Sequence, residues 1–204
     1  MNFYTAAVLI GLAYSAMALG IFLSLRIFRI PDITTDGSFT LGGAVTAVLL
    51  SQYTMHPFFA LPVVIIAGAL TGTATGVIHT RLNIHPLLAG IIVMTGLYSI
   101  SLGIMGRSNI PLIATENIFM NLPFADTLNQ WMALSGFSML LMVLMVYVLK
   151  TDFGIAMRAT GDNEQMATAS GVNAQRMKIT GLAIANALTA SSGYLVVQYQ
   201  GFAD

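Results

Sequence analysis

Apolar runs separated by short polar segments extend along almost the whole chain of 204 residues. A helix needs about 20 apolar residues to cross a hydrocarbon core about 30 Å thick. Five runs reach or approach that length, at residues 3–25, 58–80, 86–105, 131–149 and 179–198. The pattern therefore predicts an all-α, polytopic bundle of transmembrane helices.

A sixth apolar run, at residues 39–53, is shorter and follows the polar sequence PDITTDGSF. Proline removes a backbone donor and glycine loosens the chain, so such residues disfavour one straight helix here. The residues concerned are Pro31, Asp36, Gly37, Gly42 and Gly43. We therefore expect about six spans, with a broken or re-entrant second span that faces protein or a water-filled cavity.

Two interpretations of residues 32–39 stay open. In the first, Asp36 or Ser38 caps the short second helix by accepting hydrogen bonds from its opening amide groups. In the second, the segment is a gate or lines a path, because ionisable residues near the membrane interior are costly. The second interpretation assigns a path or gate to Asp32, Asp36, Gly37, Ser38, Phe39 and, from the last apolar run, Asn186.

Composition supports a lipid environment. Hydrophobic residues make up 56% of the chain and charged residues 8%, whereas soluble domains carry roughly 25% charged residues. A formal net charge of zero argues against a nucleic-acid partner, which usually requires a basic surface. The absence of cysteine excludes disulfides and thiolate metal sites. No positive segment precedes the first apolar run, so we expect a retained first span.

The basic residues predict the orientation, because cytoplasmic loops carry an excess of Lys and Arg. An N-terminus outside the cell leaves Arg107 outside, in a loop at residues 106–130 that also holds Glu116 and Asp126. The same orientation places all other basic residues in the cytoplasm: Arg26, Arg29, Arg81, Lys150, Arg158, Arg176 and Lys178. The polar segment 150–178 is then cytoplasmic.

Catalytic and metal-binding motifs are absent from the sequence. His56, His79 and His85 have no partner at ligand spacing and are expected in loops or at the membrane interface. The motifs HExxH, GxxxxGK(S/T) and GxSxG do not occur. We therefore expect no enzyme, no metal site and no cofactor, and any ATP that drives this protein would bind another chain.

Small residues recur at a spacing of four in two of the apolar runs, which lets helix backbones approach closely. They are Gly68, Gly72 and Gly76, and then Ala185, Thr189 and Gly193. Tight helix packing is one interpretation. A substrate path beside these rows is the other.

The polar sequence GIAMRATGDNEQMATASGVNAQRMK, at residues 154–178, contains signals for two short helices. Gly154 and Gly161 are expected to break the chain. Asp162 is a candidate N-cap with Gln165 three residues later, and Glu164 suits the positive end of the helix dipole. Gly171 then supplies a C-terminal stop.

An apolar stripe on the second of these helices is formed by Met166, Ala167 and Ala169. Such a stripe can insert into a groove of a partner protein. The alternative is a helix that rests on the lipid interface, although its acidic first turn suits an anionic leaflet poorly.

Two motifs resemble a known family. The sequence TDFGIAMRATGDNEQMATASGVNAQRMK resembles the cytoplasmic coupling loop of the branched-chain amino acid and ribose-type permeases of ATP-binding cassette importers. The residues that carry this resemblance, in order, are Gly154, Arg158, Asp162 or Glu164, Ala167, Gly171 and Arg176. The sequence IPDITTDGSFTLGGAV resembles the early segment of the tryptophan/tyrosine permease subgroup.

The resemblance implies a pair of permease subunits in the inner (plasma) membrane that carries a small solute, such as an aromatic amino acid. A binding protein outside would deliver the solute, and a cytoplasmic ATPase would accept the coupling helix of each permease. The residues implied in coupling are Gly154, Arg158, Gly161, Asp162, Glu164, Met166, Ala167, Ala169 and Gly171. Family members usually continue into further spans, so residues 1–204 are expected to form a single permease domain without the C-terminal spans.

Rival classes remain. A secondary transporter would need ionisable groups near the midplane of the membrane, whereas the charges here fall near span ends. A membrane-bound enzyme would need a reactive constellation of side chains. A structural membrane subunit that transports nothing is the third alternative.

Overall fold

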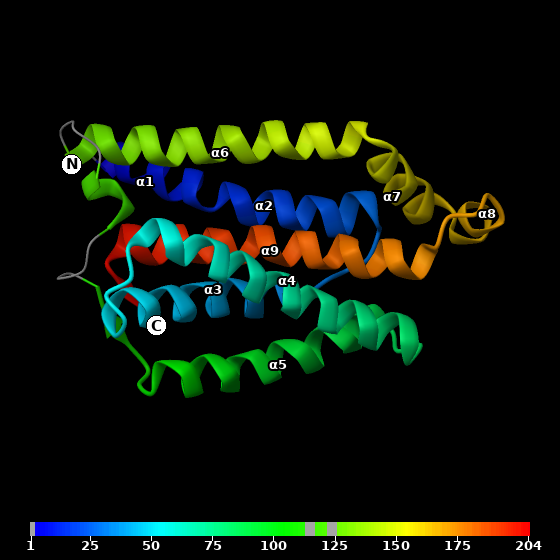
Figure 1. Cartoon of the computed structure of the whole chain (residues 1–204), viewed down its shortest axis with the longest axis horizontal. Coiled ribbons are helices and arrows are strands. Elements are labelled where there is room, and N and C mark those ends of the chain that lie inside the picture. The colour runs from blue at the N-terminus through cyan, green and yellow to red at the C-terminus, as the bar shows by residue number, and fades with distance from the viewer. Residues whose placement is uncertain (1–2, 113–116, 122–125) are drawn as a thin grey trace.

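The computed structural model describes residues 3–112, 117–121 and 126–204, and it forms a bundle of long helices (Figure 1). Among the described residues, five helical segments are long and apolar enough to cross a membrane. They are Phe3–Ile27, Pro57–Arg81, Pro86–Met105, Leu128–Lys150 and Ala174–Gln200. The predicted all-α, polytopic bundle is confirmed.

The first span is one apolar run but three helical pieces. It consists of α1 (Phe3–Ala13), α2 (Ser15–Phe22) and a π-helical turn, η1 (Leu23–Ile27). The amide of Phe28 donates to the carbonyl of Leu23 at 3.2 Å, which is the wider spacing that defines a π turn. The span therefore ends in irregular backbone, just before the connection to α3.

The second span differs from its prediction. Helix α3 (Thr34–Ser51) is continuous, and Asp36, Gly37, Gly42 and Gly43 all lie inside it. The break predicted at these residues is wrong, because the missing side chains serve helix packing instead: a Cβ on Gly42 would collide with the Ala190 carbonyl of α9. The irregular backbone lies earlier, at residues 28–33. α3 is more polar than the five candidate spans and packs on α4, α5 and α9.

Helix α9 (Ala174–Gln200) is the most buried of the candidate spans, and α6 (Asp126–Lys150) is the least buried. The row of glycines on α4 (Pro57–Arg81) faces α9. A Cβ on Gly68, Gly72 or Gly76 would meet backbone atoms of Asn186, Leu182 or Ile179, respectively. The tight-packing interpretation of this row is confirmed. Helix α5 (Pro86–Met105) lies against α3 and α4 at the edge of the bundle.

The two ends of the bundle differ (Figure 1). At one end, β1 (Ile110–Pro111) pairs antiparallel with β2 (Phe202–Ala203), near the 3₁₀ turn η2 (Ile118–Asn121) and both chain termini. At the other end, α7 (Asp152–Asp162) and α8 (Glu164–Ala169) project beyond the long helices. Glu116, in the predicted loop 106–130, lies outside the described residues, and the same holds for the rest of 113–116 and for 122–125.

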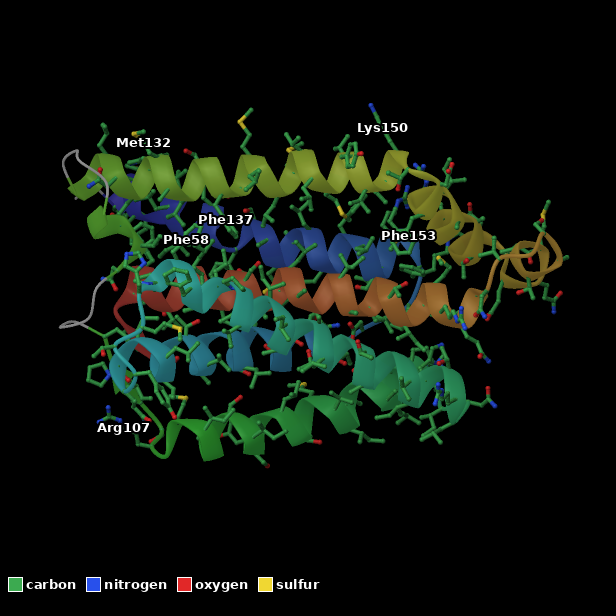
Figure 2. All side chains as sticks on the ribbon, viewed as in Figure 1. Phe58, Arg107, Met132, Phe137, Lys150 and Phe153 are labelled. Carbon is green, nitrogen blue, oxygen red and sulfur yellow. The ribbon has the colours of Figure 1, made fainter. Side chains whose placement is uncertain are left out.

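The basic residues follow this asymmetry. Arg107 lies at the end that holds both termini, whereas Lys150 lies toward the end that carries α7 (Figure 2). The other Lys and Arg residues fall in η1, the following connection, the end of α4, α7 and the start of α9. The connectivity of the helices thus separates Arg107 from every other basic residue, as the charge pattern of the sequence predicts.

Candidate functional site

Helix α7 begins at a side-chain cap. The hydroxyl of Thr151 accepts a hydrogen bond from the Gly154 amide at 3.4 Å, and Asp152 places a negative charge in the first turn. The predicted chain breaks at Gly154 and Gly161 are wrong, since both glycines lie within this helix. A Cβ on Gly154 would collide with Leu149 and its neighbours, so the glycine lets α7 fold back against the end of α6.

Two charged residues attach α7 to the rest of the bundle. The guanidinium of Arg158 donates to the Leu149 carbonyl at 2.8 Å, and so satisfies a free acceptor at the C-terminal end of α6. Asp162, the last residue of α7, pairs with Arg29 at 2.7 Å. Both side chains of this pair are about two-thirds exposed (66% and 69%), so it contributes at most about 1 kcal/mol.

Helix α8 starts one residue later than the sequence suggests. Asn163, in an extended conformation, is the N-cap, and its side-chain oxygen accepts from the Met166 amide at 3.0 Å. The prediction of Asp162 as N-cap is wrong; both residue types cap helices well, and the turn selects the second. Glu164 lies in the first turn as predicted and accepts a hydrogen bond from Lys178 at 2.6 Å.

Gly171 ends this segment as predicted. Its φ of +89° is a left-handed conformation that favours glycine. The Gly171 and Val172 amides donate to the carbonyls of Thr168 and Ala167, both at 3.0 Å. These bonds satisfy the last carbonyl groups of α8 in the manner of a glycine C-cap.

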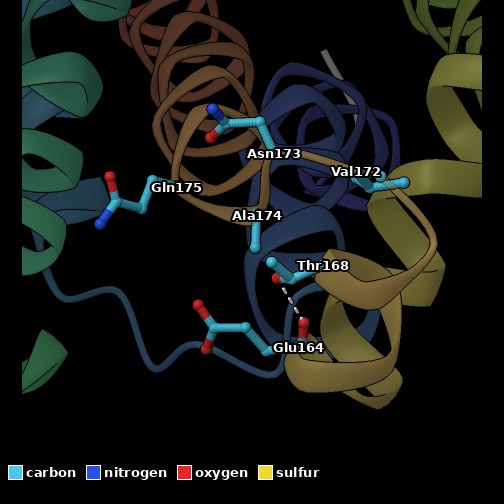
Figure 3. A pocket seen from close by; sticks show the side chains of 7 residues that line it. Glu164, Thr168, Val172, Asn173, Ala174 and Gln175 are labelled. Atoms are coloured by element: carbon cyan, nitrogen blue, oxygen red, sulfur yellow. Dashed lines mark hydrogen bonds between the residues drawn. The ribbon is translucent and has the colours of Figure 1, made fainter.

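The predicted apolar stripe of α8 does not face one direction. Ala167 is buried within the chain, at 4% exposure, whereas Met166 is 70% exposed and Ala169 is also exposed. Met166 therefore offers α8's large apolar side chain to another molecule. Next to it a cavity of about 480 Å³ opens between α8 and the start of α9 (Figure 3). It is lined by Glu164, Thr168, Gly171, Val172, Asn173, Ala174 and Gln175.

A buried polar cluster lies between α3, α4 and α9. The amide nitrogen of Asn186 donates to the Asp32 carboxylate at 2.7 Å, and the hydroxyl of Ser38 donates to the Asn186 oxygen at 2.6 Å. Ser38 also bonds with the hydroxyl of Thr71 at 2.6 Å. Asn186 and Ser38 are fully buried, whereas Asp32 is half-buried at the edge of the cluster.

The hydroxyl groups of this cluster have fewer protons than hydrogen bonds. Ser38 donates its proton to Asn186, so its bond with Thr71 requires the Thr71 proton. The same Thr71 proton is directed at the Gly68 carbonyl, 2.7 Å away. The cluster can therefore exchange donors without moving its heavy atoms, which suits an environment that meets a changing set of polar partners.

The structure divides the predicted path residues. Asp32, Ser38 and Asn186 come together, whereas Asp36 is exposed on the first turn of α3. The cap of α3 predicted at Asp36 or Ser38 is wrong, because Asp32 accepts the hydrogen bond of the Thr34 amide, at 2.9 Å.

The two remaining path residues lie elsewhere. Gly37 packs against Met94 and Leu97 of α5. Phe39 stacks on Tyr14, with ring centroids 5.4 Å apart, beside a separate cavity of about 310 Å³.

Sequence reasoning missed the threonines of the cluster. Thr71 and Thr75 lie four residues apart on α4, on the same helix face as the glycine row, and Thr75 bonds with Thr34 at 2.8 Å. That spacing was the available signal, since residues four apart share a helix face.

The histidines serve helix ends. His56 is the N-cap of α4, and its ring accepts from the Phe58 amide at 3.3 Å. His79 lies 2.8 Å from the Ile84 carbonyl near the other end of α4. Among the described residues, no group of three or more His, Asp, Glu or Cys is placed to hold a metal ion.

The fold and these sites define a multi-pass membrane protein with a buried polar cluster and a helical loop that projects at one end. Residues 3–204 match the family described as the permease component of branched-chain amino acid transport systems, and the chain belongs to this family. The family consists of transport subunits, not enzymes.

Individual relatives are similarly named. A tyrosine transport system permease protein of Clostridioides difficile is 38% identical over 95% of this chain and 64% of its own length. A Rickettsia prowazekii protein of uncharacterized function is 33% identical over 100% of this chain and 71% of its own. A "probable branched-chain amino acid transport permease" of Methanocaldococcus jannaschii is 25% identical over 88% and 61%. No solved structure gives a significant match. The chain thus spans less than two thirds of the Clostridioides difficile permease.

Proposed function

We propose that the protein is a membrane-spanning permease subunit of an ATP-binding cassette importer, and that α7 and α8 receive the motion of a separate cytoplasmic ATPase. The observation that carries the proposal is the projecting, capped α7–α8 segment (Figure 1). A solvated loop would not need three side-chain caps, which Thr151, Asn163 and Asn173 supply. A rigid helical projection can transmit a push, whereas a flexible loop would absorb it.

The orientation is part of the same proposal. The end that carries α7 and α8 also carries all Lys and Arg residues except Arg107, which favours the cytoplasmic side. The N-terminus then lies outside, together with β1 and β2. On that side an extracytoplasmic binding protein would deliver the solute, and a second permease subunit would complete the path.

The solute we propose is a small polar molecule, an amino acid and specifically an aromatic one. Membership of the family supports an amino acid, and the tyrosine permease relative supports the aromatic side chain. The buried cluster of Asp32, Ser38 and Asn186 supports a polar solute, because a carboxylate, an amide and hydroxyl groups can replace its hydration. The path would pass beside this cluster when α3 and α9 move apart.

The test uses the full chain with its ATPase and binding protein in proteoliposomes. Met166→Glu places a charge on the exposed apolar side chain of α8, and should lower co-purification of the ATPase and ATP-dependent uptake by about 30-fold. Met55→Glu is the matched control: Met55 is also exposed, but it lies at the opposite end of the bundle, and this change should alter neither readout.

Three outcomes would overturn the proposal. Retention of the ATPase and of uptake by Met166→Glu would remove α8 from the interface. Uptake driven by an ion gradient without ATP would identify a secondary transporter. No uptake under either condition, by a correctly inserted wild-type complex, would favour a structural membrane subunit.

A further inference from the structure

The connector between the first span and α3, residues 27–33, lies between the projecting helices and the buried polar cluster. One side of the connector contacts α7, and the other side contacts α9. It thereby joins two regions that the proposed function assigns to different tasks. The contacts on each side show how closely the connector is held.

On the α7 side, the contact is between backbones. Gly161 has no side chain to separate it from the connector, and a Cβ there would collide with the Ile27 carbonyl and reach the Phe28 Cα at 3.0 Å. The next residue, Asp162, pairs with Arg29 of the connector at 2.7 Å. A movement of the C-terminal end of α7 toward the bundle must therefore displace the connector.

On the α9 side, two side chains of the connector reach one helix. The ring of Phe28, 4% exposed, occupies the space beside Gly181, where a Cβ would collide with it. Four residues further on, Asp32 accepts the hydrogen bond of Asn186, which in turn accepts that of Ser38. The connector is thus in direct contact with the polar cluster.

The backbone of the connector is irregular. It follows the π turn Leu23–Ile27, and the Ile30 amide donates to the Ser24 carbonyl at 3.0 Å. Arg29 has a φ of +54°, a left-handed conformation that is costly for a residue with a Cβ. π turns and such outliers concentrate at functional hinges, where a few residues absorb a change in backbone angles.

We propose that residues 27–33 transmit the movement of α7 and α8 to the Asp32–Asn186 hydrogen bond, which holds the connector to α9 in the arrangement seen here. This proposal rests on the proposed function. Close-packed backbones at Gly161 and Ile27 leave no side chain to absorb the movement by a rotamer change. In the alternate arrangement the bond is broken, and the Asp32 carboxylate and the Asn186 amide are free to bond with a polar solute.

The experiment measures ATP hydrolysis and uptake in the same proteoliposomes, which contain permease, ATPase and binding protein. Gly161→Ala pushes the connector away from α7, and it should lower the uptake per ATP hydrolysed by roughly 2- to 30-fold, the range of coupling mutations. Gly136→Ala is the matched control. Gly136 lies in α6 with open space around its Cα, so its ratio should stay at the wild-type value.

A second set of variants guards against a folding defect in Gly161→Ala. Arg29→Glu and Asp162→Arg each place like charges together, and their combination restores an ion pair of opposite polarity. Because this pair is exposed, each variant should fold. Each single change should lower the ratio, and the double variant should recover it. Asp32→Ala should lower the ratio while ATP hydrolysis continues.

The outcomes separate this proposal from the proposed function. If the wild type shows ATP-dependent uptake while Asp32→Ala and both charge variants keep the wild-type ratio, the connector does not transmit movement. If the wild type shows no ATP-dependent uptake, the importer assignment itself fails. Failure of the double charge variant to recover, with ATP hydrolysis intact, would also count against the connector.

Discussion

Asn186 in α9 donates a 2.7 Å hydrogen bond to the Asp32 carboxylate, although 154 positions separate the two residues in sequence. The bond is charge-assisted, and its donor is fully buried, so few water molecules can replace it. It joins the last described helix to the connection that follows the first span. The early and late parts of the chain therefore close on each other at a polar contact as well as through apolar packing.

Replacement of Asn186 tests the weight of this contact. Asn186→Leu keeps a similar volume but removes the donor to Asp32 and the acceptor of Ser38, so the free energy of unfolding in detergent should fall by about 2–3 kcal/mol. Thermal or chemical denaturation measures this loss. Asn109→Leu changes an exposed asparagine and should stay within about 0.5 kcal/mol of the wild type. Equal losses in both variants would show that the buried bond contributes nothing special.

Orientation can be tested with single cysteines, because the chain contains none. Ser108→Cys lies next to Arg107, and Ser170→Cys lies just after α8; both positions are exposed, at opposite ends of the bundle. In intact cells, a membrane-impermeant thiol reagent should label position 108, and it should label position 170 only after the cells are opened. The reverse pattern would invert the topology, and labelling of both in intact cells would remove position 170 from the cytoplasm.

The ends of the spans could be predicted closely where a residue has a local conformational effect. The predicted run 86–105 coincides with α5, because Pro86 opens the helix and Gly106, at φ +66°, closes it. The second span failed for the opposite reason. Gly42 and Gly43 serve neighbouring helices, and a sequence shows the glycines but not the neighbour that requires them.

The polar sites show the same division. Asp32, Ser38 and Asn186 could each be chosen as polar residues in an apolar setting, but their mutual hydrogen bonds depend on how α3 and α9 pack. The role of Ile27 and Phe28 in the connector carries no compositional signal at all. Both are ordinary apolar residues, and only their contacts with Gly161 and Gly181 distinguish them.

The contact between α4 and α9 makes Gly72 sensitive to any added side chain. A Cβ at this position would collide with the Leu182 carbonyl, which is backbone and cannot rotate away. Gly72→Ala should therefore destabilise the protein by about 3 kcal/mol. Gly103→Ala, in α5 with open space around it, should change stability by less than about 1 kcal/mol. Thermal unfolding of both variants in detergent measures the difference, and similar stability of the two would mean that α4 and α9 do not pack this closely.

The start of α8 distinguishes two adjacent residues that the sequence alone could not separate. Asn163 accepts the hydrogen bond of the Met166 amide, whereas Asp162 pairs with Arg29 at the surface. Asn163→Ala should cost about 1 kcal/mol of local helix stability, so hydrogen exchange at the Met166 amide should accelerate about fivefold. Asp162→Ala removes only an exposed ion pair and should leave this exchange rate nearly unchanged. If Asp162→Ala accelerates exchange at Met166 and Asn163→Ala does not, the helix starts at the residue that the sequence pattern indicates.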